Sequence, residues 1–184
     1  AVPSFLISSL SVNKSTFSLE SLLAEELMNK ASMVGHQIDN FYEQRIADIK
    51  VVSQADVLES SDSTSIQQYF DEVLDANPMF VDLVVLSADK NIISASGGQD
   101  RLGSSVQSIN PALNSLFANV MASKQGDVFL TDAIKHRGQI SVFLMTPITD
   151  DSNTIVEAVL LAEAPLKPVE KMVAEFDDSV VGDK

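Results

Sequence analysis

The chain is poor in cysteine, tryptophan and basic residues. It has no Cys and no Trp, and Lys and Arg make up 12 of its 184 residues against 26 Asp and Glu. Without Cys there is no disulfide, thiolate zinc site or Cys nucleophile, although a bacterial periplasm and a cytosol both remain open. The formal net charge of -14 argues against nucleic-acid partners and anionic membrane surfaces, because both need a basic face.

The sequence also lacks the motifs of common catalytic chemistry. It has no G-x-S-x-G elbow, Gly97-Gly98 is not followed by the Lys-Ser/Thr of a phosphate loop, and His36 and His136 do not form a zinc-protease helix. We therefore expect no enzyme activity, no catalytic residue, no metal site and no cofactor. A hydrolase stays an alternative only if the adjacent carboxylates Asp150-Asp151 and Asp177-Asp178 converge in a cleft.

Long apolar runs are absent as well. No stretch approaches the roughly 18–20 apolar residues that span a bilayer. Residues 1–12 (AVPSFLISSLSV) are nevertheless apolar and uncharged. They are either the outer end of a more hydrophobic segment or an ordinary N-terminal segment that docks on the core. We assign residues 1–17 to a membrane-proximal segment of a membrane-anchored parent protein.

Helical periodicity dominates the first third of the chain. Apolar residues recur at steps of three and four between Leu27 and Val52, and no Pro occurs between Lys14 and Asn77. With Ser18 as N-cap, the pattern predicts one helix of roughly forty residues, about 60 Å long. Such a helix exceeds a compact domain of this size, so we expect the stripe from Leu27 to Val52 to form the seam of a homodimer.

The remaining chain alternates short helices with β-rich segments. We predict strands at Phe80–Ala88, Asn91–Ser96, Asp127–Ile134, Gln139–Ile148 and Thr154–Ala164, and further helices at Ile66–Ala76, Ala112–Ser123 and Val169–Phe176. Most connections between strands are short, which predicts antiparallel hairpins and an α+β fold. The domain organisation is then two helices over 18–78, a sheet over 79–168, and an exit helix with tail over 169–184.

Four stretches carry a resemblance to a known family. They are IDNFYEQRIADIKVVSQADVL, NPMFVDLVVLSADKNIISASG, GDVFLTDAIKHRGQISVFLMTPI and VEAVLLAEAPLKPVEKMV. In order and spacing they resemble the Cache family of PAS-like extracytoplasmic sensors, over residues 24 to about 176. The Arg-x-Trp-Tyr signature of the amino-acid-binding members is missing, since the chain has no Trp.

The resemblance implies both a fold and a role. The fold would be a single Cache module, with a long N-terminal helix packed on a five-stranded antiparallel PAS-like sheet. The role would be ligand sensing in the periplasmic or extracellular part of a bacterial inner-membrane receptor, namely a histidine kinase of a two-component system, a chemoreceptor of chemotaxis or a diguanylate cyclase. A small organic acid or amine would bind the sheet, and the long helix would transmit the signal.

The same resemblance, with strand alternation, points to ligand-binding residues. The candidates are Asp132, Phe143, Met145, Ser141, Phe129 and Arg101. Asp132 lies where the family's ligand-amine Asp falls, and Arg101 could hold an anion through its planar fork. The alternatives are that Phe143 and Met145 are plain core and that the two charged residues are surface residues, as we expect for His136 and Arg137 at a hairpin tip.

A second function is compatible with the same fold. The chain could be a ligand-free dimerisation or partner-docking domain. This hypothesis predicts a fully packed sheet face and no stabilisation by small molecules.

Overall fold

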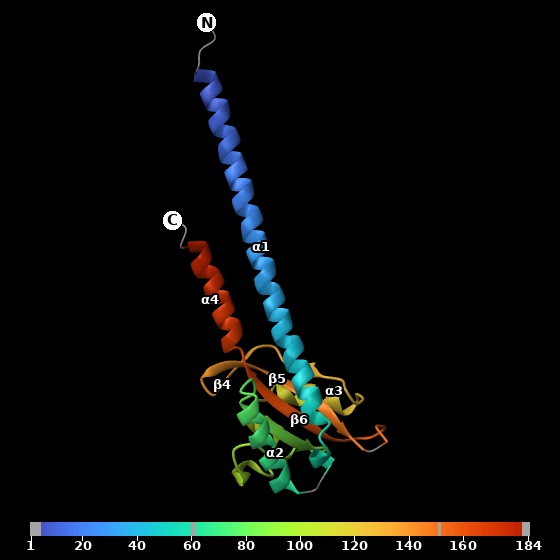
Figure 1. Ribbon diagram of the computed structural model, residues 1–184. Coiled ribbons are helices and arrows are strands. Elements are labelled where there is room, and N and C mark those ends of the chain that lie inside the picture. Colours follow the sequence, from blue (N-terminus) through green and yellow to red (C-terminus); the bar gives the residue numbers. More distant parts are fainter. Residues whose placement is uncertain (1–4, 60–61, 151, 182–184) are drawn as a thin grey trace. The chain divides into compact units, whose positions relative to one another are not determined.

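The helices and strands follow the predicted order in a computed structural model, which describes residues 5–59, 62–150 and 152–181 (Figure 1). The helices are α1 (Phe5–Ser53), α2 (Ser63–Ala76), α3 (Leu113–Met121) and α4 (Lys167–Val181). Short 3-10 turns lie at Asp56–Glu59, Gln99–Arg101 and Val106–Ser108. The strands are β1 (Asp82–Ser87), β2 (Ile92–Ala95), β3 (Phe129–Leu130), β4 (Ile134–His136), β5 (Gln139–Thr149) and β6 (Val156–Pro165). The α+β class is thus confirmed.

The described strands form one antiparallel sheet in the order β2-β1-β6-β5-β3, with β4 also paired to β5. The sheet therefore has six strands rather than the predicted five, because the segment 127–134 does not form one strand. Thr131 donates its backbone N–H to the Phe143 carbonyl, and its Oγ1 accepts the Phe143 N–H, both at 3.0 Å. This side chain takes the place of a backbone partner in the ladder, which ends β3 and leaves Asp132 and Ala133 exposed.

The long helix begins earlier than expected. α1 has 49 residues and starts at Phe5, so the predicted N-cap at Ser18 is wrong. No Pro or Gly occurs between Phe5 and Ser18, and the absence of a breaker outweighs one Ser as a boundary signal. No helix within the described residues combines the length and the apolar content needed to cross a membrane.

The chain divides into two compact units. One is Phe41–Pro168, which holds the sheet, and the other comprises residues 1–40 and 169–184, with most of α4. α1 contributes to both units. In the second unit its apolar residues Leu22, Leu23, Met28 and Met33 are 55–74% exposed.

The sheet carries buried side chains on both faces. One face carries an apolar cluster that α3 covers, formed by Val84, Leu86, Ile92, Ala95, Val106, Leu113, Phe117, Val120, Phe143, Met145, Val159 and Leu161. Strand alternation directs the intervening buried residues, such as Leu83 and Leu144, to the opposite face. The part of α1 that lies in this unit buries Phe41, Ile49 and Val52. These three residues, which the sequence places in the second half of the dimer seam, therefore belong to the core of the chain itself. The prediction of a seam is wrong for this part of the stripe.

Candidate ligand-binding site

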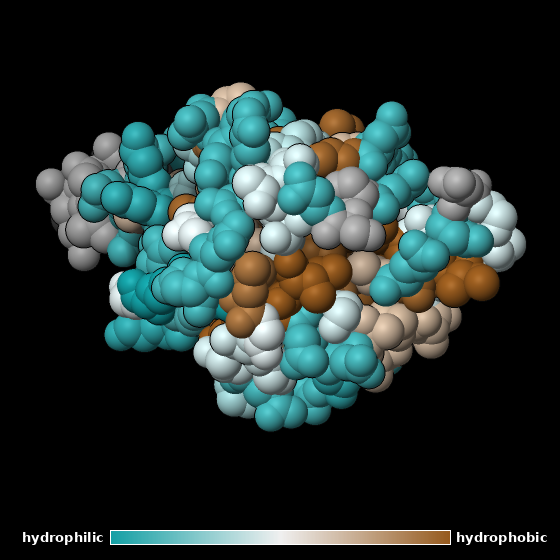
Figure 2. Space-filling model, turned by 90° about the horizontal axis from the view of Figure 1, so that it is seen from below, coloured by the Kyte–Doolittle hydropathy of each residue, from teal (hydrophilic) through white to brown (hydrophobic). Residues whose placement is uncertain are grey.

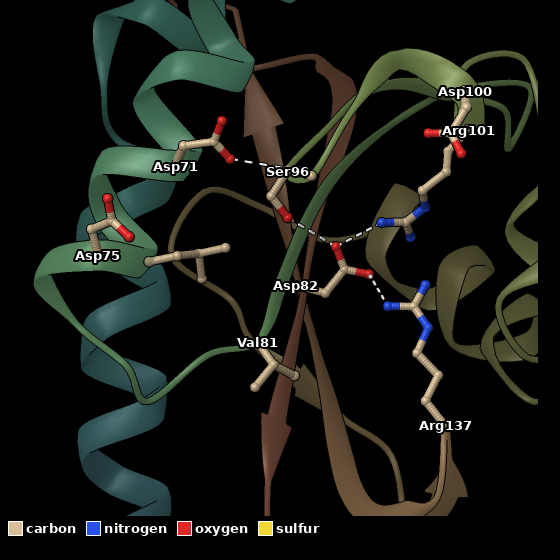
Figure 3. Close-up of a pocket in the computed structure, with 10 residues that line it drawn as sticks. Asp71, Asp75, Val81, Asp82, Ser96, Asp100, Arg101 and Arg137 are labelled. Atoms are coloured by element: carbon tan, nitrogen blue, oxygen red, sulfur yellow. Dashed lines mark hydrogen bonds and ion pairs between the residues drawn. The ribbon is translucent and has the colours of Figure 1, made fainter.

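A pocket of about 400 Å³ lies where β1 begins (Figure 3). Its lining is Asp71, Leu74, Asp75, Val81, Asp82, Ser96, Gly97, Asp100, Arg101 and Arg137. These residues come from α2, from the start of β1, from the loop after β2, and from the β4–β5 hairpin. The pocket thus lies wholly within the sheet-bearing unit.

Asp82 is the centre of the pocket's charge network. It is 4% exposed, and its Oδ1 accepts hydrogen bonds from Ser96 Oγ at 3.0 Å and from Arg101 Nη1 at 2.8 Å. Arg137 Nη1 lies 3.6 Å from the other oxygen, Oδ2. Figure 3 shows the two guanidinium groups approaching Asp82 from different loops. The carboxylate therefore fixes both arginines at one wall of the pocket.

A second buried carboxylate lies beside the first. Glu163 on β6 is 1% exposed and is the register partner of Asp82 on β1. Its Oε1 accepts from Ser141 Oγ at 2.8 Å, and its Oε2 is hydrogen-bonded with His136 Nδ1 at 3.0 Å. Like charges opposite each other on paired strands destabilise a sheet unless cations or donors compensate them. His136 is therefore largely buried, at 14% side-chain exposure, contrary to the prediction for the hairpin tip, whereas Arg137 is exposed as predicted.

One donor in this network is unused. Arg101 Nη2 is buried and has no hydrogen-bond partner among the described residues. Buried N–H groups are nearly always paired in proteins, and a guanidinium presents five donors in a fixed fork. An acceptor that enters the pocket would complete this fork.

The opposite wall is acidic. Asp71 and Asp75 project from α2 across the space from the arginines (Figure 3), and Asp71 Oδ1 accepts the Gly97 N–H at 3.4 Å. Of the described lining residues, four are Asp and two are Arg. The lining therefore carries a net negative charge, and the two arginines share their wall with Asp82 and Asp100.

The structure distributes the predicted ligand-binding residues over four environments. Phe143 and Met145 are at most 1% exposed inside the apolar cluster, and Phe129 packs against that cluster. Ser141 is fully buried and donates to Glu163. Asp132 is exposed in the break between β3 and β4. Of the six, only Arg101 lines the pocket.

Sequence reasoning passed over Asp82 and Glu163, the two residues that organise the pocket. A signal for them was present, because each is a lone carboxylate inside an apolar strand sequence, FVDLVVL and VLLAEAP. A charge in such a run must find partners or face a cavity. The pattern predicts a polar site without indicating which loops supply the partners.

The adjacent carboxylates have other environments. Asp150 accepts from the backbone N–H groups of Thr154 and Ile155, at 2.8 and 2.9 Å, inside the β5–β6 turn. Hydrogen bonds from Ser152 and from this backbone lower the pKa of Asp150 to about 2. Asp151 lies outside the described residues, and Asp177 and Asp178 are exposed on α4. No group of His, Cys, Asp and Glu within the described residues is arranged to hold a metal ion.

The sequence itself matches no family model and no curated protein.

Three solved structures illustrate the similarity. The sensor domain of the V. cholerae histidine kinase DctB aligns with a TM-score of 0.64 at 15% identity, over 84% of this chain and 60% of that one. A domain of a sensory box/GGDEF family protein from Vibrio parahaemolyticus gives 0.61 at 10% identity, over 83% and 63%. The ligand-binding domain of the Campylobacter jejuni chemoreceptor Tlp3, in complex with 4-methylisoleucine, gives 0.60 at 13% identity, over 85% and 63%.

These structures define the fold of the chain as that of bacterial receptor sensor domains, as the Cache-like sequence pattern predicts. The chain spans about 60% of the length of each of them.

Proposed function

We propose that this chain is an extracytoplasmic ligand-sensing domain of a bacterial membrane receptor, without catalytic activity, and that its ligand binds the pocket at the start of β1. The observation that carries the proposal is the unpartnered Arg101 Nη2 at a polar pocket in a sensor-type fold. The neighbouring sensor and ligand-binding domains support the sensing role through the shared fold.

The pocket is a better candidate than the centre of the sheet face. Under α3 the face is filled by large apolar side chains, including Phe117, Phe143 and Met145, each at most 2% exposed. A ligand there would have to displace close-packed core. The pocket at β1 already has volume and polar anchors, as ligand sites usually do.

The free donor of Arg101, rather than the net charge of the pocket, favours a small molecule with an anionic group. Carboxylates pair with guanidinium forks in a bidentate way, and Arg101 and Arg137 converge on one wall. An amine on the same molecule would face Asp71 and Asp75 on α2. A small organic acid, with or without an amine, is therefore the ligand class to test first.

The test is a thermal-shift screen of the purified chain against organic acids, amines, amino acids and sugars. A ligand present at about 100 times its dissociation constant stabilises a domain by about 2.7 kcal/mol. Arg137→Ala should abolish the shift, because Arg137 is 56% exposed and its loss removes a ligand contact with little effect on folding.

Lys135→Ala is the matched control, since Lys135 is an exposed cation on the same hairpin but does not line the pocket. A compound whose shift survives Arg137→Ala and is lost in Phe143→Leu would move the site to the centre of the sheet. A flat screen would overturn the sensing proposal.

A ligand-free docking or dimerisation domain is the second candidate. The exposed apolar residues of α1, from Leu22 to Met33, favour it. A separate group of hydrophobic side chains is visible when the molecule is seen from below, on an otherwise largely hydrophilic surface (Figure 2). Met28 is 74% exposed. If α1 forms a seam, Met28→Glu should convert a dimer to a monomer in sedimentation velocity, with no change in the thermal unfolding of the sheet unit.

A further inference from the structure

The part of α1 that belongs to the sheet-bearing unit carries a buried cation. Arg45 is 1% exposed and lies on the helix between the core residues Phe41 and Ile49. Its guanidinium carbon is 5.1 Å from the centroid of the Phe41 ring and 5.9 Å from that of Phe80. Two aromatic faces thus hold the cation, an arrangement that is favourable when the cation is desolvated.

Conventional partners for Arg45 are few. Nη1 is 2.7 Å from Asp48 Oδ2, one turn along the same helix, and Asp48 is 34% exposed. Nε is buried without a hydrogen-bond partner among the described residues. Burial lowers the pKa of Arg45, and the negative charge of Asp48 opposes that shift. The cation is therefore incompletely compensated, and its only described ion pair lies toward solvent.

Phe80 links this cation to the pocket. Phe80 is 2% exposed and directly precedes Val81 and Asp82, which both line the pocket. Val81 donates its backbone N–H to the Glu163 carbonyl at 3.0 Å, which ties this segment to β6. Phe80 is thus two residues from Asp82 along the chain, and its ring lies against Arg45.

We propose that the contact between Arg45 and Phe80 couples the pocket to α1 and makes α1 displaceable. This inference rests on the proposed function only in taking the pocket as the place where a ligand acts. Arg45 is a positioning residue here: it touches no ligand and acts through Phe80.

The physical reason is the balance between burial and hydration of the guanidinium. An apolar side chain between Phe41 and Ile49 would lock α1 against the sheet unit, because every displacement would expose apolar surface. A partly unsatisfied cation gains hydration when α1 moves, which offsets part of that cost. Arg45 thus lowers the free energy of the displaced arrangement relative to the packed one.

The test is a double-mutant cycle read by hydrogen–deuterium exchange, and it needs no ligand. Arg137→Ala removes one partner of Asp82 and serves as the perturbation of the pocket. We expect it to speed exchange of the α1 amides over 41–53 by about threefold in the wild-type background and to have no effect in the Arg45→Met background. The amides of α3, on the other face of the sheet, are the internal control and should not change.

Arg45→Met alone should raise the melting temperature and slow exchange over 41–53, because it removes a buried cation with an unpartnered N–H, while the Asp48 carboxylate left behind is 34% exposed and is hydrated. If Arg137→Ala changes exchange over 41–53 equally in the wild-type and Arg45→Met backgrounds, the coupling is wrong. If Arg45→Met lowers the melting temperature, the buried cation is not what destabilises the packed arrangement of α1.

If Arg45→Met does not fold, Asp48→Asn provides the second variant. It leaves Arg45 without its ion pair and should speed exchange over 41–53, whereas Glu43→Gln, an exposed acid-to-amide change near the same helical turn, should not. Unchanged exchange in Asp48→Asn would count against the proposal. A flat ligand screen combined with a positive double-mutant cycle would reject the sensing function while leaving the coupling intact.

Discussion

Two adjacent regions of one sheet face differ sharply in character. Met145, Leu161 and Val84 are register neighbours on β5, β6 and β1, and they form closed apolar core beneath α3. Two residues along each strand on the same face, Phe143, Glu163 and Asp82 are neighbours, and two of these three are buried carboxylates. The same strands therefore form apolar core in one stretch and carry buried charges in the next.

The apolar stretch and the charged stretch differ in the free energy of burying their side chains. Apolar burial stabilises by about 25 cal/mol per Å², so the centre holds the fold together. A buried carboxylate costs several kcal/mol unless cations and donors surround it. At the start of β1 that role requires Arg101 and Arg137 from two separate loops, and the loops leave a pocket between them and α2.

The largest effect should come from the apolar centre. Phe143→Ala should destabilise the domain by about 3–5 kcal/mol, because it leaves a cavity in close-packed core. Urea denaturation followed by circular dichroism measures this loss. Ile93→Ala on β2 is the control, since Ile93 is 44% exposed. A loss as small for Phe143→Ala as for Ile93→Ala would contradict the division between the two regions.

A smaller effect is expected at the charged end of the face. Asp82→Asn should destabilise by about 2 kcal/mol, the scale of a hydrogen bond to a charged group, because Arg101 and Arg137 would face a neutral acceptor. Asp100→Asn, an exposed pocket residue, should be near neutral. Thermal unfolding at neutral pH compares the two, and equal stabilities would mean that Asp82 does not organise the network.

The smallest effect is expected at Asp150, whose hydrogen-bond partners all lie in the β5–β6 turn. The pKa of Asp150 is lowered from 3.8 to about 2, so its ionised form stabilises the folded state above the ordinary pKa, and this contribution disappears as pH falls through about 2. Asp150→Asn should therefore lower the melting temperature slightly at pH 7 and not at pH 2. Asp89→Asn, an exposed turn acid, is the control, and a pH-independent difference would remove the assigned cause.

Much of the fold could be predicted from local pattern. The hairpins were readable because β-branched runs alternate with short polar turns, and the helices because apolar residues recur at three and four. Two boundaries were not readable. Ser18 has the chemistry of an N-cap, yet α1 continues through it. Thr131 lies in a strand-like run, yet its hydroxyl accepts the Phe143 N–H and ends β3.

The candidate site was predictable only in part. Arg101 was identified from the loop that the family resemblance indicates, and it lines the pocket. Phe143 and Met145 were placed on the correct face by alternation, but alternation does not distinguish a ligand floor from core. That distinction depends on α3 and the loop before it, which cover these residues.

The sequence by itself determined the α+β class, the hairpins and the long helix, because spacing along the chain fixes which residues share a face. It also determined that lone acids occur inside two apolar strands. Only the tertiary structure decided that Asp82 and Glu163 are register partners, and that the loop after β2 and the β4–β5 hairpin bring Arg101, Arg137 and His136 to them. Pairing between strands distant in sequence depends on the packing of the whole sheet, and no local pattern encodes it.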